Sequence, residues 1–327
     1  MTGISDNFNR PINYLRISVT DRCNLRCIYC MPPEGVKHIP HSDVLSYEEI
    51  STVAKAAAEM GINKIRLTGG EPLVRARLTN LVGMLSGIEG IDDLSLTTNG
   101  ILLDRYAQEL KTAGLKRVNV SIDSLLPDRF RQITRLGTLD DTLRGIEVAK
   151  EVGLFPIKVN VVVMEGVNEE EIVDFARMTV DEGWNVRFIE LMPVGEQNEE
   201  GQLGFVPVSD IREQVESLGK LEPCTLDGNG PAKYFRLPQA NGTIGFISPV
   251  SEHICFRCNR MRLTADGKLR PCLLRDDEID MRGPLREGAS IKDLKSLIRK
   301  AILAKPVGHQ LNIGATANSR RMSQIGG

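Results

Sequence analysis

The sequence predicts an α/β fold in which six strand–helix units form an incomplete barrel, followed by a smaller α+β layer. Strand and helix patterns alternate from Tyr14 to Pro193, and the alternation stops after that proline. Strands that alternate with helices form parallel sheets. The 327 residues leave room for an appendage, because one barrel unit often takes roughly 200–250 residues. We therefore expect a barrel over residues 1–220 and a second region over residues 221–327.

The expected elements follow in chain order from the spacing of apolar residues. The strands of the barrel are expected at Tyr14–Thr20, Lys64–Gly69, Asp93–Asn99, Arg117–Asp123, Pro156–Met164 and Asn185–Met192. Its helices are expected at Tyr47–Met60, Leu78–Leu85, Asp104–Thr112, Thr138–Val152 and Glu169–Glu182. After Pro193 we expect helices at Val208–Leu218 and Ile291–Ala304, strands at Tyr234–Leu237 and Thr243–Ile247, and a hairpin turn at Asp266-Gly267.

Polar side chains recur at alternate positions of the barrel strands, which favours a curved sheet over a flat, doubly wound one. Parallel strands covered on both faces usually read as continuous apolar runs. Successive side chains of a strand point to opposite faces, so one face here should meet the helices and the other should line a polar interior. The inward set is Arg16, Ser18, Thr20, Arg66, Thr68, Ser95, Thr97, Asn99, Asn119, Ser121, Asp123, Lys158 and Asn160.

Three of these inward residues, Arg16, Arg66 and Lys158, are cations. Buried cations are costly unless they are paired, and Asp123 could pair with one of them. A polyanionic ligand such as a phosphate ester would satisfy all three, because arginine binds phosphate with two parallel hydrogen bonds. Internal ion pairs, or strand ends that face solvent, are the alternative interpretation.

A short loop after the first strand holds Cys23, Cys27 and Cys30 in a C-x3-C-x2-C pattern. An iron–sulfur cube normally takes one thiolate per iron, so three thiolates leave one iron open to a substrate or cofactor. A structural zinc site is closed by four ligands, and here His38 or His41 would have to complete it. The spacing favours the open cluster.

The second strand ends in the turn Gly69-Gly70-Glu71-Pro72. Two glycines allow close backbone approach, and proline suits the start of a following turn or helix. Barrels of strand–helix units place their sites at the C-terminal ends of the strands. We therefore expect this turn to border the functional site.

A second cysteine set, formed by Cys255, Cys258 and Cys272, has the pattern C-x2-C-x13-C. Iron–sulfur and zinc interpretations are equally open here, because Cys224 could supply a fourth thiolate. Zinc ribbons, however, have paired cysteine knuckles, and Cys224 stands alone between Pro223 and Thr225.

Composition argues against two classes of function. A formal net charge of −2 does not provide the basic footprint that non-specific nucleic-acid binding needs. No apolar run approaches the ~18–20 residues that span a membrane, and the first ten residues lack the apolar core of a signal peptide. We expect a cytoplasmic protein, in which cysteines serve more often as metal ligands or catalysts than as disulfides.

The cysteine loop with Tyr29, the Gly69–Pro72 turn and the six strand–helix units resemble radical S-adenosylmethionine enzymes. The second cysteine set, with Asn259-Arg260-Met261-Arg262 inside it, narrows the resemblance to the GTP 3′,8-cyclase family. This family opens molybdenum cofactor (molybdopterin) biosynthesis. The resemblance extends over essentially the whole chain.

The resemblance implies two [4Fe-4S] clusters, one on each cysteine set, with S-adenosylmethionine on the open iron of the first. It implies that S-adenosylmethionine is lined by Tyr29, Gly70, Ser121 and Met192. It implies that GTP is bound by Arg16, Arg66, Thr97, Lys158, Arg260, Met261 and Arg262. It also implies an electron donor such as flavodoxin or ferredoxin, a homodimer, and cyclic pyranopterin monophosphate synthase as the enzyme that accepts the product.

The implied activity is the conversion of GTP to (8S)-3′,8-cyclo-7,8-dihydroguanosine 5′-triphosphate, started when a 5′-deoxyadenosyl radical removes the C3′ hydrogen. The chain ends in Gly326-Gly327. Terminal residues are usually frayed, but in this family the double-glycine tail is implicated in reaching the active site. We therefore include both glycines among the catalytic candidates.

Two other functions stay open. A different radical enzyme with an auxiliary cluster would act on a peptide and would not need the inward cations. A non-catalytic zinc-binding adaptor would use Cys224 to close one site. The alternating polar face and the lack of paired cysteine knuckles count against the adaptor.

Overall fold

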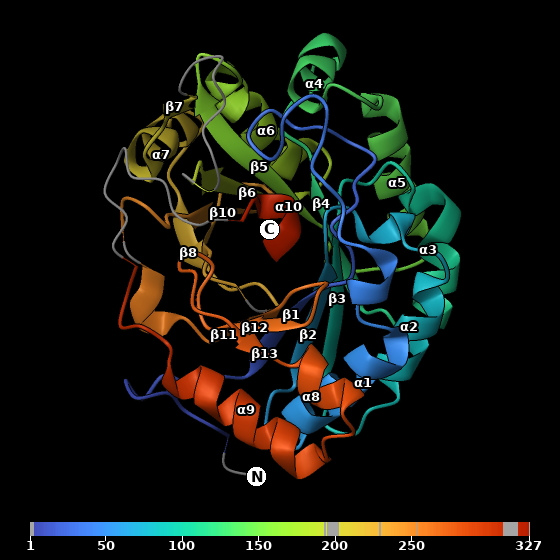
Figure 1. The fold of residues 1–327 in the computed structure, drawn as a ribbon. Helices are drawn as coiled ribbons and strands as arrows, with labels where there is room; N and C mark the ends of the chain where they lie inside the picture. The colour runs from blue at the N-terminus through green and yellow to red at the C-terminus, as the bar shows by residue number, and fades with distance from the viewer. Residues whose placement is uncertain are drawn as a thin grey trace.

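The chain forms one mixed sheet that curves into an open barrel, with most of the helices on its outside (Figure 1). The computed structural model describes residues 3–192, 194, 203–228, 230–252, 254–309 and 320–326. The strand order is β13-β12-β11-β1-β2-β3-β4-β5-β6-β10-β9-β8. Within these residues the end strands β13 and β8 do not pair with each other, so the barrel does not close.

Six strand–helix units build the barrel, which confirms the predicted fold class. The strands are β1 (Tyr14–Ser18), β2 (Lys64–Thr68), β3 (Asp93–Thr98), β4 (Arg117–Ser121), β5 (Lys158–Glu165) and β6 (Asn185–Glu190), each parallel to the next. The helices are α1 (Tyr47–Ala58), α2 (Leu78–Ser86), α3 (Leu103–Thr112), α4 (Pro127–Thr134), α5 (Leu139–Glu151), α6 (Ile172–Asp181) and α7 (Val208–Glu216). Both α4 and α5 connect β4 to β5, and α7 follows β6. Helix α4 was not predicted.

The C-terminal region extends this sheet at both edges. Strand β10 (Thr243–Ile247) runs parallel to β6, and β11 (Arg260–Leu263) runs parallel to β1. The other strands of this region are β8 (Glu222–Cys224), β9 (Lys233–Arg236), β12 (Lys268–Arg270) and β13 (Ile279–Asp280), and its helices are α8 (Arg282–Arg286), α9 (Ile291–Leu303) and α10 (Met322–Ile325). The short strand β7 (Gly204–Phe205) lies off this strand order and pairs with β5.

The hydrophobic core lies between the outer face of the sheet and the helices. Ile17, Val118 and Val159 are fully buried there, at the strand positions that alternate with the polar residues. Helix α1 begins at a capping box in which Ser46 and Glu49 satisfy each other's backbone N–H groups, an arrangement that stabilises helix starts. In the described part of the chain, no helix is both long and apolar enough to cross a membrane.

Candidate active site

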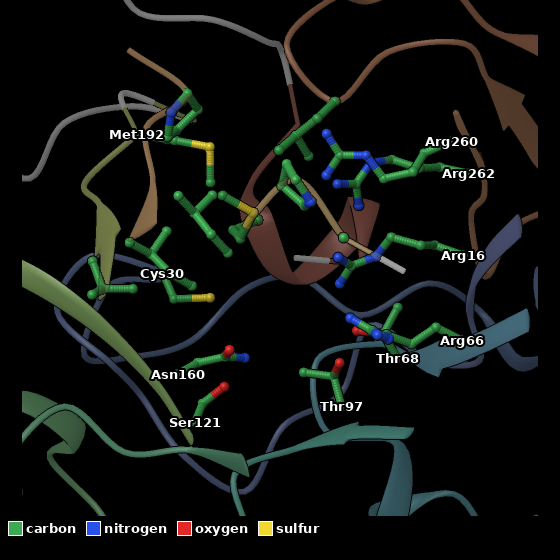
Figure 2. A pocket seen from close by; sticks show the side chains of 18 of the residues that line it. Arg16, Cys30, Arg66, Thr68, Thr97, Ser121, Asn160, Met192, Arg260 and Arg262 are labelled. Carbon is green, nitrogen blue, oxygen red and sulfur yellow. The ribbon is translucent and has the colours of Figure 1, made fainter. Parts of the chain in front are cut away.

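A cavity inside the open barrel is lined by residues from both regions of the chain. All six cysteines of the two sets line it. Figure 2 shows the positive side chains gathered on one wall, opposite Cys30 and Met192. The labelled members of this positive wall are Arg16, Arg66, Arg260 and Arg262.

The first cysteine set lies on the loop that follows β1. The N–H of Cys30 donates to the carbonyl of Cys27 at 2.9 Å, and the N–H of Leu25 donates to Sγ of Cys23 at 3.4 Å. Burial raises the pKa of Cys23 to about 12 and that of Cys30 to about 11. A thiolate is costly here until a cation compensates it, which suits metal binding.

Helix α4 and the glycine turn hold this loop from two sides. The N–H groups of Arg26 and Ile28 donate to carbonyls at the end of α4, each at 3.0 Å. From the other side, the N–H of Gly70 donates to the carbonyl of Thr20 at 2.7 Å. A Cβ atom on Gly70 would clash with the carbonyl oxygen of Arg22. The turn therefore needs glycine in order to approach the cysteine loop.

Asp123 fixes Tyr29 beside the first cysteine set. Its carboxylate accepts hydrogen bonds from the Tyr29 hydroxyl and from the N–H of Val162, both at 2.8 Å. The Asp123 carboxylate is therefore hydrogen-bonded to these two groups and not to an inward cation, which the sequence had suggested as its partner. Burial raises the pKa of Asp123 to about 6.

The second cysteine set comes from two segments, the turn around Ile254–Arg257 and the loop that follows β12, where Cys272 is the second residue beyond the strand. The N–H of Leu274 donates to Sγ of Cys272 at 3.4 Å, which repeats the contact made to Cys23. The buried Lys305 donates to the carbonyls of Arg260 and Pro271, at 2.8 and 2.6 Å. Burial alone would raise the pKa of Cys258, but the charges of Arg260 and Lys305 lower it to about 6.

The donor sets fit iron–sulfur cubes better than closed zinc sites. Among the described residues, no three His, Cys, Asp or Glu side chains are placed to share a single metal ion. Zinc ligands converge on one ion at about 2.0–2.3 Å, whereas a cube takes thiolates at separate corners. The residues that line the cavity do not include Cys224, His38 or His41, the candidates for a closing ligand.

Three arginines stand side by side across neighbouring strands. The register places Arg262 of β11 next to Arg16 of β1, and Arg16 next to Arg66 of β2. Burial, together with repulsion from neighbouring arginines, lowers the pKa of Arg66 and of Arg262 to about 10. Buried like charges in a row repel one another, so an anion with several charges would stabilise them.

Two further buried cations, Lys158 and Arg187, belong to the barrel strands β5 and β6. Lys158 donates to the carbonyl of Asp227 and does not line the cavity. Burial, and then Arg187, Arg117 and Arg66, lower the pKa of Lys158 to about 6. Arg187 of β6 does line the cavity. Arg187 is not among the residues predicted to face inward, although the period-two pattern of β6 indicates it.

The remaining candidates divide into two groups. Tyr29, Gly70, Thr97, Ser121 and Met192 line the cavity. The side chain of Met261 packs into the hydrophobic core, because it alternates along β11 with Arg260 and Arg262.

The C-terminal tail enters the barrel. Helix α10 lies inside the ring of strands in Figure 1, and Met322 and Ser323 line the cavity. Nη1 of Arg262 donates to the carbonyl of Gly326 at 2.6 Å. Gly326 has a φ of +73°, and a Cβ there would lie 2.9 Å from Cγ2 of Thr68. Gly327 lies outside the described residues.

Comparison with known families identifies the class. Residues 17–179 match the radical SAM superfamily, and residues 184–311 match the Molybdenum Cofactor Synthesis C family. The fold is similar to that of Streptococcus suis SuiB bound to S-adenosylmethionine, with a TM-score of 0.62 and 15% identity over 88% of this chain and 68% of that one. The chain is a member of the radical S-adenosylmethionine superfamily.

Curated relatives narrow the assignment. GTP 3′,8-cyclase from Desulforamulus reducens is 54% identical over 98% of this chain and 99% of that protein. The enzymes of the same name from Pelotomaculum thermopropionicum and Moorella thermoacetica are 53% and 52% identical, each over 99% of this chain and 100% of the relative. The chain therefore belongs to the GTP 3′,8-cyclase family.

Proposed function

We propose that this protein converts GTP to (8S)-3′,8-cyclo-7,8-dihydroguanosine 5′-triphosphate, the first step of molybdenum cofactor biosynthesis. The observation that carries the proposal is the row Arg262–Arg16–Arg66, which lines the same cavity as both cysteine sets. A nucleoside triphosphate would place its phosphates on the positive wall and its sugar and base between the two sets. A peptide substrate would not need this row of cations.

Cys23, Cys27 and Cys30 would hold one [4Fe-4S] cluster with S-adenosylmethionine, and the second set would hold the other. When bound, the first cluster and S-adenosylmethionine supply the 5′-deoxyadenosyl radical that removes the C3′ hydrogen of GTP before C3′ bonds to C8. We assign S-adenosylmethionine contacts to Tyr29, Gly70, Ser121 and Met192. We assign GTP contacts to Arg16, Arg66, Thr97, Arg260, Arg262 and the main chain of Met261. Lys158 does not line the cavity, so we propose that it acts on the triphosphate through its charge.

The residues of the chain have three tasks in this reaction. The arginines bind the triphosphate and hold the ribose at a fixed distance from the first cysteine set, since small displacements of reacting groups cost large factors in rate. Asp123 holds Tyr29 in place through the hydrogen bond between their side chains. The barrel and the tail up to Gly326 exclude water, which would divert a reactive intermediate.

The proposal includes partners. A reductant of low potential, such as flavodoxin or ferredoxin, would supply electrons, and cyclic pyranopterin monophosphate synthase would accept the product. A homodimer in the cytoplasm is the assembly that we propose from the family resemblance.

The test is anaerobic incubation of the reconstituted protein with reductant, S-adenosylmethionine and GTP deuterated at C3′. We expect deuterium in the 5′-deoxyadenosine, together with a cyclised isomer of GTP, both measured by mass spectrometry. Unlabelled 5′-deoxyadenosine would overturn the assigned abstraction site. No 5′-deoxyadenosine from protein with verified clusters would favour the zinc-binding adaptor.

A further inference from the structure

One arginine fixes the C-terminal tail to the rim of the barrel. Arg320 directs two nitrogens at Asp266, with distances of 3.1 Å from Nη1 to Oδ1 and 2.9 Å from Nη2 to Oδ2. It also reaches Glu278, at 2.9 Å from Nη2 to Oε2 and 2.9 Å from Nε to Oε1. Paired contacts of this kind are the strongest and most directional ion pairs that arginine makes.

Both carboxylates are fixed by other residues of the chain. Asp266 lies in the turn between β11 and β12 and accepts a hydrogen bond from Thr264 Oγ1 at 2.5 Å. Glu278 precedes β13 and pairs with Arg270, whose side chain is fully buried. The side chains of Arg320, Asp266 and Glu278 are only 21%, 18% and 20% exposed. A partly buried network of this kind is less screened by water than an isolated surface pair.

The anchor lies close to the end of the chain. Gly326 follows Arg320 by six positions, and helix α10 occupies four of the residues between them. A helical residue advances only about 1.5 Å along the axis, so the position of Arg320 limits where Gly326 can lie. Ser323 and Ile325 are each 1% exposed on this path. The path ends where Arg262 donates to the carbonyl of Gly326.

We propose that Arg320 is a positioning residue that keeps the C-terminal tail, through Gly326, in the active site by its contacts to Asp266 and Glu278. The inference rests on the proposed function of the tail. Without the anchor the tail would have to be ordered for each turnover, and fixing each backbone residue costs about 1–2 kcal/mol of conformational free energy. The fraction of molecules with Gly326 in place would therefore fall, and kcat would fall with it.

The experiment compares Arg320→Gln with Asp266→Asn, the double variant and a chain that ends at Ile325. Arg177→Gln is the matched control, because it breaks an exposed ion pair with Asp174 on α6. Hydrogen–deuterium exchange of the C-terminal peptide reports tail order. Initial rates of cyclisation report kcat and the KM for GTP, and iron content verifies both clusters.

We expect Arg320→Gln to speed exchange in the tail and to lower kcat about tenfold, the size of coupling expected for contacting residues. The KM for GTP should change by less than about twofold, since Arg320, Asp266 and Glu278 do not line the cavity. The double variant should be no worse than either single variant. Arg320→Lys should recover part of kcat.

The chain that ends at Ile325 separates the proposed function of the tail from the proposed anchoring role of Arg320. If it cyclises GTP as fast as the full chain, the proposed function of the tail fails, whatever Arg320 does. If it is slow, Arg320→Gln should lower its rate no further. An equal loss from Arg320→Gln in both backgrounds, or unchanged tail exchange in the full chain, would overturn the anchor.

Discussion

The two cysteine sets face one cavity from surroundings of opposite charge. Around the first set, burial raises the pKa of each thiol, and the charge of Glu71 or Asp123 adds to the effect. Around the second set, Arg260 and Lys305 overcome burial and lower the pKa of Cys258. The surroundings of the first set therefore disfavour added negative charge, whereas those of Cys258 stabilise it. Burial raises the pKa of Cys255, so the stabilisation is centred on Cys258.

This difference bears on electron transfer. The potential of an iron–sulfur cluster depends on local charge and on hydrogen bonds to its sulfurs. Acidic, buried surroundings should make the first cluster the stronger reductant, which suits cleavage of a sulfonium. Cationic surroundings should make the second cluster easier to reduce, and the same cations border the wall that we assign to the triphosphate.

The largest expected effect separates the roles of the two sets. Cys27→Ala should abolish formation of 5′-deoxyadenosine, because it removes a ligand of the cluster that holds S-adenosylmethionine. Cys258→Ala should abolish cyclisation but leave measurable 5′-deoxyadenosine and about half of the iron. Cys224→Ala should change neither product. Mass spectrometry of both products checks the result, and complete loss of S-adenosylmethionine cleavage in Cys258→Ala with an intact first cluster would contradict this division.

A smaller effect is expected on stability when the glycine turn beside the first cysteine set is changed. Gly70→Ala places a Cβ atom against the carbonyl of Arg22, and overpacking of this kind typically costs about 1–3 kcal/mol. Gly83→Ala in α2 is the matched control, because its Cβ would meet nothing within 4 Å. It should stabilise the helix by roughly 0.5–1 kcal/mol. Thermal unfolding measures both changes, and equal shifts in the two variants would contradict the close approach at Gly70.

A change at Lys305 should shift the reduction potential of the second cluster and leave that of the first cluster unchanged. Lys305→Met removes a buried cation beside Cys258 and Cys272, so the second cluster should become harder to reduce. The potential of the first cluster should stay constant. Lys300→Met, at an exposed position of α9, is the control. Redox titration followed by electron paramagnetic resonance measures both reduction potentials. An unchanged potential of the second cluster would show that Lys305 acts only on packing.

The smallest expected effect is the uptake of protons when GTP binds. In the free protein the pKa of Lys158 is lowered to about 6, so this lysine is mostly neutral at pH 7.5. A bound polyanion would raise that pKa, so GTP binding should take up part of a proton and should weaken as pH rises through the pKa of the bound state. Calorimetry in two buffers of different ionisation enthalpy measures the uptake. Lys158→Gln should abolish it, and equal uptake by that variant would assign the proton elsewhere.

The parts of the site that depend on local pattern could be predicted from sequence. Arg16 and Arg66 follow from period-two alternation in β1 and β2, and the cysteine motifs follow from spacing. The pairing of β1 with β11 joins residues about 250 positions apart, and no local pattern predicts it. Lys305 lies beyond the end of α9, where no periodicity applies. His309 also lies in a loop beyond α9, where it is buried and contacts the carbonyl of Pro249 at 2.6 Å.

The pairing of β11 with β1 also sets an order of events during synthesis. Arg16 and Arg66 leave the ribosome early, but their neighbours Arg260 and Arg262 follow only after most of the chain has been made. Domains generally fold from the N-terminus as they emerge, so the first cysteine loop and half of the positive wall exist before the rest. A nascent chain therefore has a place for one cluster well before it has a complete place for the nucleotide.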